Sequence, residues 1–391
     1  MRLPNDAGPA VRLEHSTPFD PGRPADFDVF PPVSAIFALF PDEKPGVPAQ
    51  PYLSHTRDLR RRLRRLLSPP ESASRWLNLH GITRRIDYQP AGSNFEAQWL
   101  LFLLNRHYYP LHFRRRLRLK PPALVKINLQ NRFPRCYPAR RILRDGALYY
   151  GPFPSLAAAE RFTSEFLDLF KIRRCTPDLN PDPSHPGCIY SQMRMCLAPC
   201  FKGCTDEEYR QELDDVIRFL GSAGATLVRN LEAERTQASE SLEFEQAARA
   251  HKKLEKVKEI QRLRPPLVKK LSELNAVMVL PGAGSHSVTF FRVAAGELCG
   301  PAKLSLEENV SSPVPLDHQI AQLLGSLREN GKSQSPRVPP WEHLTLLARW
   351  YYSSFRTGEI VLLPHDQEIP HARLLRLCRK VLAGNEPKAP A

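Results

Sequence analysis

The sequence predicts an α+β protein that is built from several small domains, and three observations support this fold class. The chain has 391 residues, which is enough for two to four domains with separate cores. Short apolar runs typical of strands are interspersed with stretches whose leucines recur at helical spacing. Residues 175–204 are rich in proline, whereas residues 205–263 contain no proline and carry dense charge, so the chain changes character twice.

In the first half of the chain, the apolar pattern alternates between the two kinds of element. Short apolar runs predict strands over 33–40, from Tyr52 onward, over 123–129 and over 147–153. Apolar residues at helical spacing predict helices over 58–67, 95–108 and 155–170. Ser93 and Asn94 precede the second helix and are suitable caps for it.

In the second half, residues 205–263 predict two antiparallel helices that end at Arg264-Pro265-Pro266. Strands are predicted over 276–280, 287–306 and 359–364, and AAGE (294–297) reads as a hairpin turn within the second of them. Helices are predicted over 317–329, 341–355 and 371–382. The ends, residues 1–30 and 385–391, are expected to be disordered tails, the first because it is rich in proline, aspartate and glycine.

The charge is concentrated in one half of the chain. The formal net charge is +15, and residues 1–204 hold 31 basic against 17 acidic residues. The remainder is nearly balanced, so we expect the first half to bind a polyanion such as DNA and the second to meet a different partner. The sequence has no apolar run long enough to cross a membrane and no signal-peptide pattern, so we expect a cytoplasmic protein without a membrane partner.

Four cysteines are spaced as a metal site would require. Cys175, Cys188, Cys196 and Cys200 give C-x12-C-x7-C-x3-C in a loop that has little apolar surface to bury. Cytosolic thiols stay reduced, so a metal explains the cluster better than disulfides do. The spacing alone leaves an iron–sulfur cluster and tetrahedral zinc both open, with Cys204 as a spare sulfur.

The segments RILRDGALYYGPFPS (141–155) and GCIYSQMRMCLAPCFKGCTDEEY (187–209) resemble the cysteine-rich region of the bacterial UvrC excinuclease family. The resemblance extends over about residues 33–380. In that family the four cysteines hold a 4Fe–4S cluster, so the resemblance favours iron–sulfur at the four positions named above. The sequence ends before the RNase H-like nuclease and the helix-hairpin-helix motifs of that family, so we expect both parts to be lacking.

Residues 31–130 are similar to the GIY-YIG nuclease domain that begins UvrC. The stretch from Tyr52 to Leu63 matches the family phrase YVGKAKNLRNRL, and the GIY tripeptide falls on Ala35-Ile36-Phe37. Such a nuclease uses a tyrosine to help activate water, an arginine to steady the phosphate and a glutamate to hold one divalent metal. The resemblance places Tyr52 and Arg62 as remnants of this catalytic set.

The remaining positions of the set depart from the family. Phe37 replaces a tyrosine, His55 a lysine, Leu101 the metal-binding glutamate and Phe113 an asparagine. Without that glutamate, we expect hydrolysis to be lost or weak and magnesium to matter only if the nuclease is active. Arginines remain on the predicted helix and near residue 115, and we expect them to contact the DNA backbone: Arg57, Arg60, Arg61, Arg64, Arg65, Arg114, Arg115, Arg116 and Arg118.

The predicted helix pair carries a second motif of the family. SLEFEQAARAHKKLEKVKEIQRL (241–263) resembles the UVR motif, through which UvrC binds the matching motif of UvrB. It departs from that motif at His251 and Lys252. Apolar residues on one helical stripe would form the contact with a UvrB-like protein: Leu242, Phe244, Ala247, Ala248 and Leu254.

These features predict four folded parts: a degenerate GIY-YIG-like α/β domain (31–130), a cysteine-liganded loop module (131–204), an antiparallel helical UVR hairpin (205–263) and a small C-terminal α/β domain (264–384). The leading hypothesis is a UvrC-like nucleotide excision repair protein that binds DNA and a UvrB-like partner. Two alternatives stay open: an active repair endonuclease that makes a single incision, and an iron–sulfur regulatory protein that binds nucleic acid.

Overall fold

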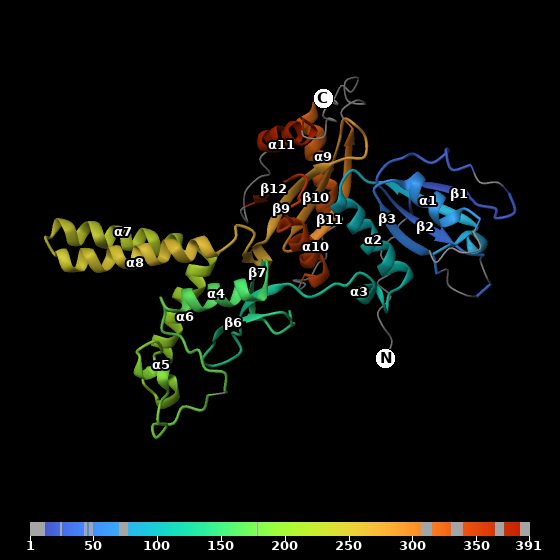
Figure 1. The fold of residues 1–391 in the computed structure, drawn as a ribbon. Coiled ribbons are helices and arrows are strands. Elements are labelled where there is room, and N and C mark those ends of the chain that lie inside the picture. The colour runs from blue at the N-terminus through green and yellow to red at the C-terminus, as the bar shows by residue number, and fades with distance from the viewer. Residues whose placement is uncertain are drawn as a thin grey trace.

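Three four-stranded antiparallel sheets organise the chain (Figure 1). A computed structural model describes residues 12–23, 26–42, 45–46, 50–69, 77–177, 179–305, 315–329, 339–363 and 371–383. Helices cover these sheets, so the predicted α+β class is confirmed. No helix in these ranges combines the length and the apolar character that membrane crossing requires.

The first sheet has the order β1-β4-β2-β3, with bounds His15–Pro18 (β1), Ala35–Phe40 (β2), Tyr52–Thr56 (β3) and Arg85–Pro90 (β4). Every residue of β2 is buried because α1 (Leu59–Leu67) covers one face of the sheet and α2 (Asn94–Tyr108) the other. Asp58 accepts a hydrogen bond from the Arg61 backbone N–H and Ser93 accepts one from Glu96, so each helix begins at a side-chain cap.

The prediction of a disordered tail over residues 1–30 is wrong for its second half. Strand β1 pairs with β4, and the side chains of Phe19, Phe27 and Phe30 are buried in the core beside α1. The average composition of the segment concealed these three phenylalanines, each of which gains free energy by leaving water. Residues 1–11 and the predicted tail 385–391 lie outside the described residues.

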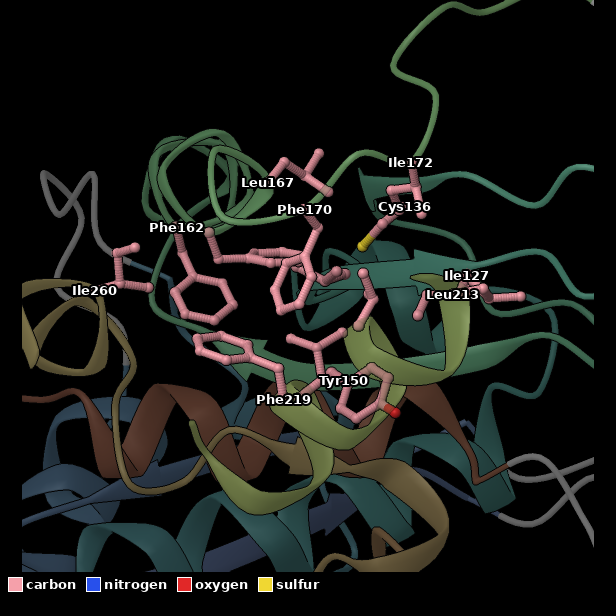
Figure 2. Close-up of a cluster of buried hydrophobic side chains, with 14 of the residues drawn as sticks. Ile127, Cys136, Tyr150, Phe162, Leu167, Phe170, Ile172, Leu213, Phe219 and Ile260 are labelled. Atoms are coloured by element: carbon pink, nitrogen blue, oxygen red, sulfur yellow. The ribbon is translucent and has the colours of Figure 1, made fainter. Parts of the chain in front are cut away.

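The second sheet has the order β6-β5-β7-β8, with bounds Ala123–Ile127 (β5), Cys136–Ala139 (β6), Leu148–Phe153 (β7) and Lys269–Lys270 (β8). Its core includes aromatic and aliphatic side chains from α4 (Leu156–Leu167), α6 (Asp206–Ser222) and α8 (Phe244–Leu263) (Figure 2). Strand β5 therefore lies in this sheet, although the predicted boundary grouped it with residues 31–130. Strand β8 returns to the sheet only after the helical segment.

The segment 205–263 contains three helices, where two were predicted. Helix α6 ends at Ala223 and Gly224, whose φ angles are +56° and +80°, and α7 (Ala225–Glu240) then pairs with α8. Helix α6 packs Tyr209, Leu213 and Phe219 into the second core. Gly224 allows this break because glycine takes a left-handed conformation at little cost. The charge pattern, which is uniform across the segment, gave no sign of it. The α7–α8 hairpin projects away from the sheets (Figure 1).

The third sheet has the order β11-β10-β9-β12, with bounds Asn275–Pro281 (β9), Ser287–Ala294 (β10), Glu297–Ser305 (β11) and Glu359–Leu363 (β12). The AAGE turn is confirmed, because β10 and β11 pair on either side of Ala295 and Gly296. Helices α9 (Leu316–Glu329) and α11 (His371–Ala383) pack on one face of this sheet, and α10 (Trp341–Tyr351) packs on the other.

Helix α2 belongs to two cores at once. Its Leu100 and Leu104 pack on the first sheet, whereas Phe95 and Trp99 pack against the third sheet and α10. The approach is closest at Gly92, where a Cβ atom would lie 2.0 Å from the backbone carbon of Gly282. No side chain fits there. The first and third sheets are therefore held together through α2, beside which α10 lies in Figure 1.

Candidate nucleic-acid and metal sites

The two predicted catalytic remnants contact each other. An Nη2 hydrogen of Arg62 on α1 is donated to the hydroxyl of Tyr52 on β3 at 3.2 Å. The ring of Phe37 is fully buried, with its centroid 6.2 Å from that of Tyr52. An apolar ring in the core beside α1 thus stands where the resemblance predicts a tyrosine hydroxyl.

The other two positions lie on the opposite side of the sheet. His55 and Leu101 both line a cavity of about 320 Å³ between β3, α2 and the end of α10. Neither Tyr52 nor Arg62 lines it, because successive residues of a strand point to opposite faces. Burial lowers the pKa of His55, which favours its neutral form. The structure therefore does not bring Tyr52 and Arg62 into one site with His55 and Leu101.

Among the residues that the structure describes, no carboxylate lines this cavity. Phe113 is buried against Phe102, with ring centroids 5.9 Å apart, so the asparagine position belongs to the core. Glu96, the only acidic residue on α2, is fully buried and accepts a hydrogen bond from the Gly92 N–H at 3.1 Å. Burial raises its pKa, although Lys303 lies 3.9 Å away. Glu96 therefore does not line the cavity that contains Leu101.

Several of the nine arginines that were predicted to contact DNA have intramolecular partners. Arg60 donates to the Phe30 carbonyl at 2.7 Å, and Arg64 forms an ion pair with Asp28 at 3.2 Å. Arg65, on the last turn of α1, also interacts within the chain. The first two contacts hold the N-terminal segment on α1, a role that could not be foreseen while that segment was expected to be disordered.

Near α3 (Phe113–Arg116), two more of the nine arginines contact other residues of the chain. Arg114 pairs with Glu342 of α10 at 2.7 Å, and Arg116 donates to Asn105 of α2 at 2.9 Å. The side chains of Arg57, Arg61, Arg115 and Arg118 are exposed. These four remain predicted DNA contacts.

The cysteine loop is anchored to the second core by Arg173. This fully buried side chain donates to the Phe133 carbonyl at 2.7 Å and approaches the Cys175 sulfur at 3.7 Å. Cys188 caps a short helix, α5 (Ile189–Gln192), and Cys200 lies in a 3-10 turn, Pro199–Phe201. The Ala198 N–H donates to the Cys196 sulfur at 3.3 Å. N–H donors of this kind stabilise thiolates, so the surroundings suit metal-ligating cysteines.

The thiols of the four cysteines are electrostatic neighbours. Burial, together with repulsion from Cys175, Cys188 and Cys200, raises the pKa of Cys196 to about 11. Such mutual repulsion of thiolates is what a bound cation relieves. Among the described residues, however, no three histidine, cysteine or acidic side chains are already grouped as a metal site. The ligand set is therefore still a prediction.

The predicted partner-binding residues separate into two groups. Leu242 and Phe244, at the turn between α7 and α8, have exposed fractions of 71% and 67%. Ala247 and Ala248 follow near the start of α8. Ala247 is half-buried and Ala248 is exposed. Leu254 is fully buried in the second core, so its assignment to the partner surface is wrong. The C-terminal half of α8 packs on α4, which a single helical stripe could not reveal.

Comparison with known proteins matches two segments of the chain to family models. Residues 124–219 match the middle domain of the UvrC/Cho excinuclease, and residues 225–260 match the UvrB/UvrC motif. The first segment covers strands β5, β6 and β7 of the second sheet and the cysteine loop, and the second covers most of the α7–α8 hairpin.

Curated relatives that match a larger part of the chain belong to the same family. UvrABC system protein C of Desulforudis audaxviator is 30% identical over 281 residues, which is 70% of this chain and 44% of that protein. The Ruminiclostridium cellulolyticum protein of the same name is 28% identical over 216 residues, which is 55% of this chain and 35% of the relative. The chain thus spans less than half the length of these curated relatives. No solved structure matches significantly.

Proposed function

Because this chain belongs to the UvrC family, whose middle domain and UVR motif it carries, we propose that it acts in nucleotide excision repair as a DNA-binding and partner-docking protein with little or no nuclease activity. On this proposal, the first sheet with α1 and α2 is a degenerate GIY-YIG domain. Its exposed arginines contact the DNA backbone, and the hairpin turn contacts a UvrB-like protein.

The observation that carries the proposal is the lack of a carboxylate where hydrolysis would need one. Within the described part of the chain, the cavity that contains His55 and Leu101 has no acidic residue in its lining, and Glu96 is buried toward the third sheet. Metal-assisted hydrolysis of a phosphodiester requires an anionic ligand that holds the cation beside the phosphate. Hydrolysis also requires that the catalytic groups meet in a single site. The Tyr52–Arg62 pair lies apart from this cavity, so this requirement is not met either.

The cysteine loop has a structural part in this proposal. Cys175, Cys188, Cys196 and Cys200 would hold a 4Fe–4S cluster, or alternatively zinc, and the bound group would fix a loop that has few apolar contacts. The chain's own contribution is visible in Arg173, which connects this loop to the buried backbone at Phe133.

The proposal is tested by combining a cleavage assay with a binding assay. Purified protein is incubated with damaged and undamaged duplex DNA and magnesium, with and without a UvrB protein, and DNA binding is measured in parallel. We expect salt-sensitive DNA binding and no nicking above background. Robust nicking that is abolished by chelator and by Tyr52→Phe would establish the alternative, an active endonuclease. Absence of both DNA binding and UvrB binding would overturn the proposal altogether.

A further inference from the structure

The cavity beside α2 has the size and the chemistry of a nucleotide site. Its volume of about 320 Å³ falls at the lower end of the range of small-ligand pockets. Its floor is apolar, formed by side chains such as Leu101, Leu346 and Trp350. Its rim is polar and includes Asn94 and Gln98 of α2 and Ser353 and Thr357 beyond α10.

Two arginines give this cavity a net positive charge. Arg349 donates to the backbone carbonyls of Leu117 and Arg118, which fixes its guanidinium at the wall. Arg356 lies over the rings of Trp350 and Tyr351, at 5.3 and 5.1 Å from their centroids. None of the described lining residues is acidic, so neither guanidinium meets a carboxylate from that lining. Two guanidinium groups held in place without a counterion in the lining are suited to a phosphate group.

An exposed aromatic ring completes the cavity. Phe355 also lines it, yet 93% of the side chain is exposed, the highest value among the large apolar side chains of the described residues. Exposing a phenyl ring to water is unfavourable, and single-strand binding proteins use such rings to stack bases. Phe355 and Arg356 both line this cavity, so a base and its phosphate can reach both together.

We propose that this cavity binds one nucleotide of a DNA single strand, with the phosphate on Arg349 and Arg356 and the base against Phe355. The inference rests on the proposed function, because it assigns a place to the DNA strand. Leu101, the position at which the family resemblance puts the metal-binding glutamate, forms part of the floor. A strand is thus held at that position without being cut.

The test uses the whole 391-residue chain and a single-stranded oligonucleotide that contains 2-aminopurine, whose fluorescence falls when the base stacks. The variants are Phe355→Ala and Arg356→Gln. The matched control is Arg379→Gln on α11, which removes an exposed charge on the other face of the third sheet. Phe355 is almost fully exposed, so its removal leaves the core intact. A fully paired duplex and free dAMP serve as further ligands.

We expect Phe355→Ala to weaken single-strand binding about tenfold and to abolish the quenching. Arg356→Gln should weaken it several-fold and reduce the slope of log affinity against log salt by about 0.7. Duplex affinity should stay within about twofold for both variants. Reversal of the quenching by dAMP would support a pocket that also accepts free nucleotides. Reversal by unlabelled oligonucleotide alone would support a pocket that needs a strand.

The inference is overturned if Phe355→Ala and Arg356→Gln bind the oligonucleotide as Arg379→Gln does. In that case DNA binding by the unmodified protein still supports the proposed function. If the unmodified protein binds neither single-stranded nor duplex DNA, the proposed function fails and the inference fails with it. The two failures are therefore distinguishable.

Discussion

His343 of α10 illustrates how burial fixes the state of a single side chain. Its ring lies between Trp99 and Phe102 of α2, with centroids 4.9 and 5.5 Å away. Its Nδ1 accepts a hydrogen bond from the Leu298 N–H at 3.2 Å. Burial lowers its pKa to about 3 from an ordinary value of 6.5. This histidine therefore stabilises the contact between α2 and the third sheet only while it is neutral.

This buried histidine predicts a loss of stability in mild acid. The pKa is lower in the folded state, so the unfolded chain binds the proton first and the stabilisation is lost as the pH falls from about 6.5 toward 3. Between pH 7.5 and pH 5 we expect the free energy of unfolding to fall by about 2 kcal/mol on this account. Urea denaturation at both pH values measures it. His343→Asn, which keeps an acceptor, should reduce the difference, whereas His107→Asn at the surface should not.

At the scale of an element, the α7–α8 hairpin combines a buried base with an exposed tip. Leu254 and Val257 anchor α8 in the second core, while Leu242 and Phe244 remain exposed at the turn. Leu242 has a φ of +60°, a conformation that leucine rarely adopts. A rigid hairpin that exposes two apolar side chains at its tip is suited to dock on a similar hairpin, because little ordering accompanies the contact.

We expect Phe244→Ala to weaken binding to a UvrB C-terminal hairpin by about 2–4 kcal/mol, provided that the ring becomes buried as an anchor. Titration calorimetry measures the affinity. Asn230→Ala, an exposed substitution at the base of α7, should leave it unchanged. An unchanged affinity for Phe244→Ala, with an intact circular dichroism spectrum, would place the contact elsewhere.

The cysteine loop supplies a prediction about metal content. Protein that is purified without oxygen should contain about four iron and four sulfide per chain. Cys200→Ser, in the 3-10 turn of the loop, should lose the iron, whereas Cys299→Ser on β11 should retain it. Elemental analysis and visible absorption decide the matter. Stoichiometric zinc without iron would rule out the iron–sulfur version and leave the four-cysteine site standing.

Across the whole molecule, charge and packing divide the chain differently. The positive charge is concentrated before residue 205, yet α2 from that part packs against the third sheet, which forms after residue 274. Helix α2 therefore joins the first sheet to the α10 side of the third sheet. Some of the arginines that were predicted to contact DNA form contacts within the chain instead. We therefore assign the phosphate contacts to the exposed arginines that have no such contact within the described residues.

Neutralising Arg57 and Arg61 together should lower the slope of log duplex affinity against log salt by about two units, since each phosphate contact contributes about 0.9. Both side chains are exposed. The matched control, Arg373→Gln with Arg379→Gln, removes the same charge from α11. Equal effects of the two pairs would mean that DNA responds to net charge alone, and would contradict a local contact at α1.

The local pattern of the sequence determined most elements and the family. Apolar spacing predicted α1, α2 and α4, because helical periodicity is set by residues three and four apart. The motif around Phe244 predicted the hairpin tip, and the cysteine spacing predicted where a metal would bind. Each of these inferences needs only neighbours along the chain.

Only the tertiary structure decided what each element packs against. It placed Phe19 and Phe30 in a core, moved β5 into the second sheet and buried Leu254. It also separated Tyr52 and Arg62 from the cavity of His55 and Leu101. It assembled that cavity from residues more than 200 positions apart along the chain. Such contacts depend on pairing between distant segments, and that pairing leaves no periodic signal in the sequence of either one.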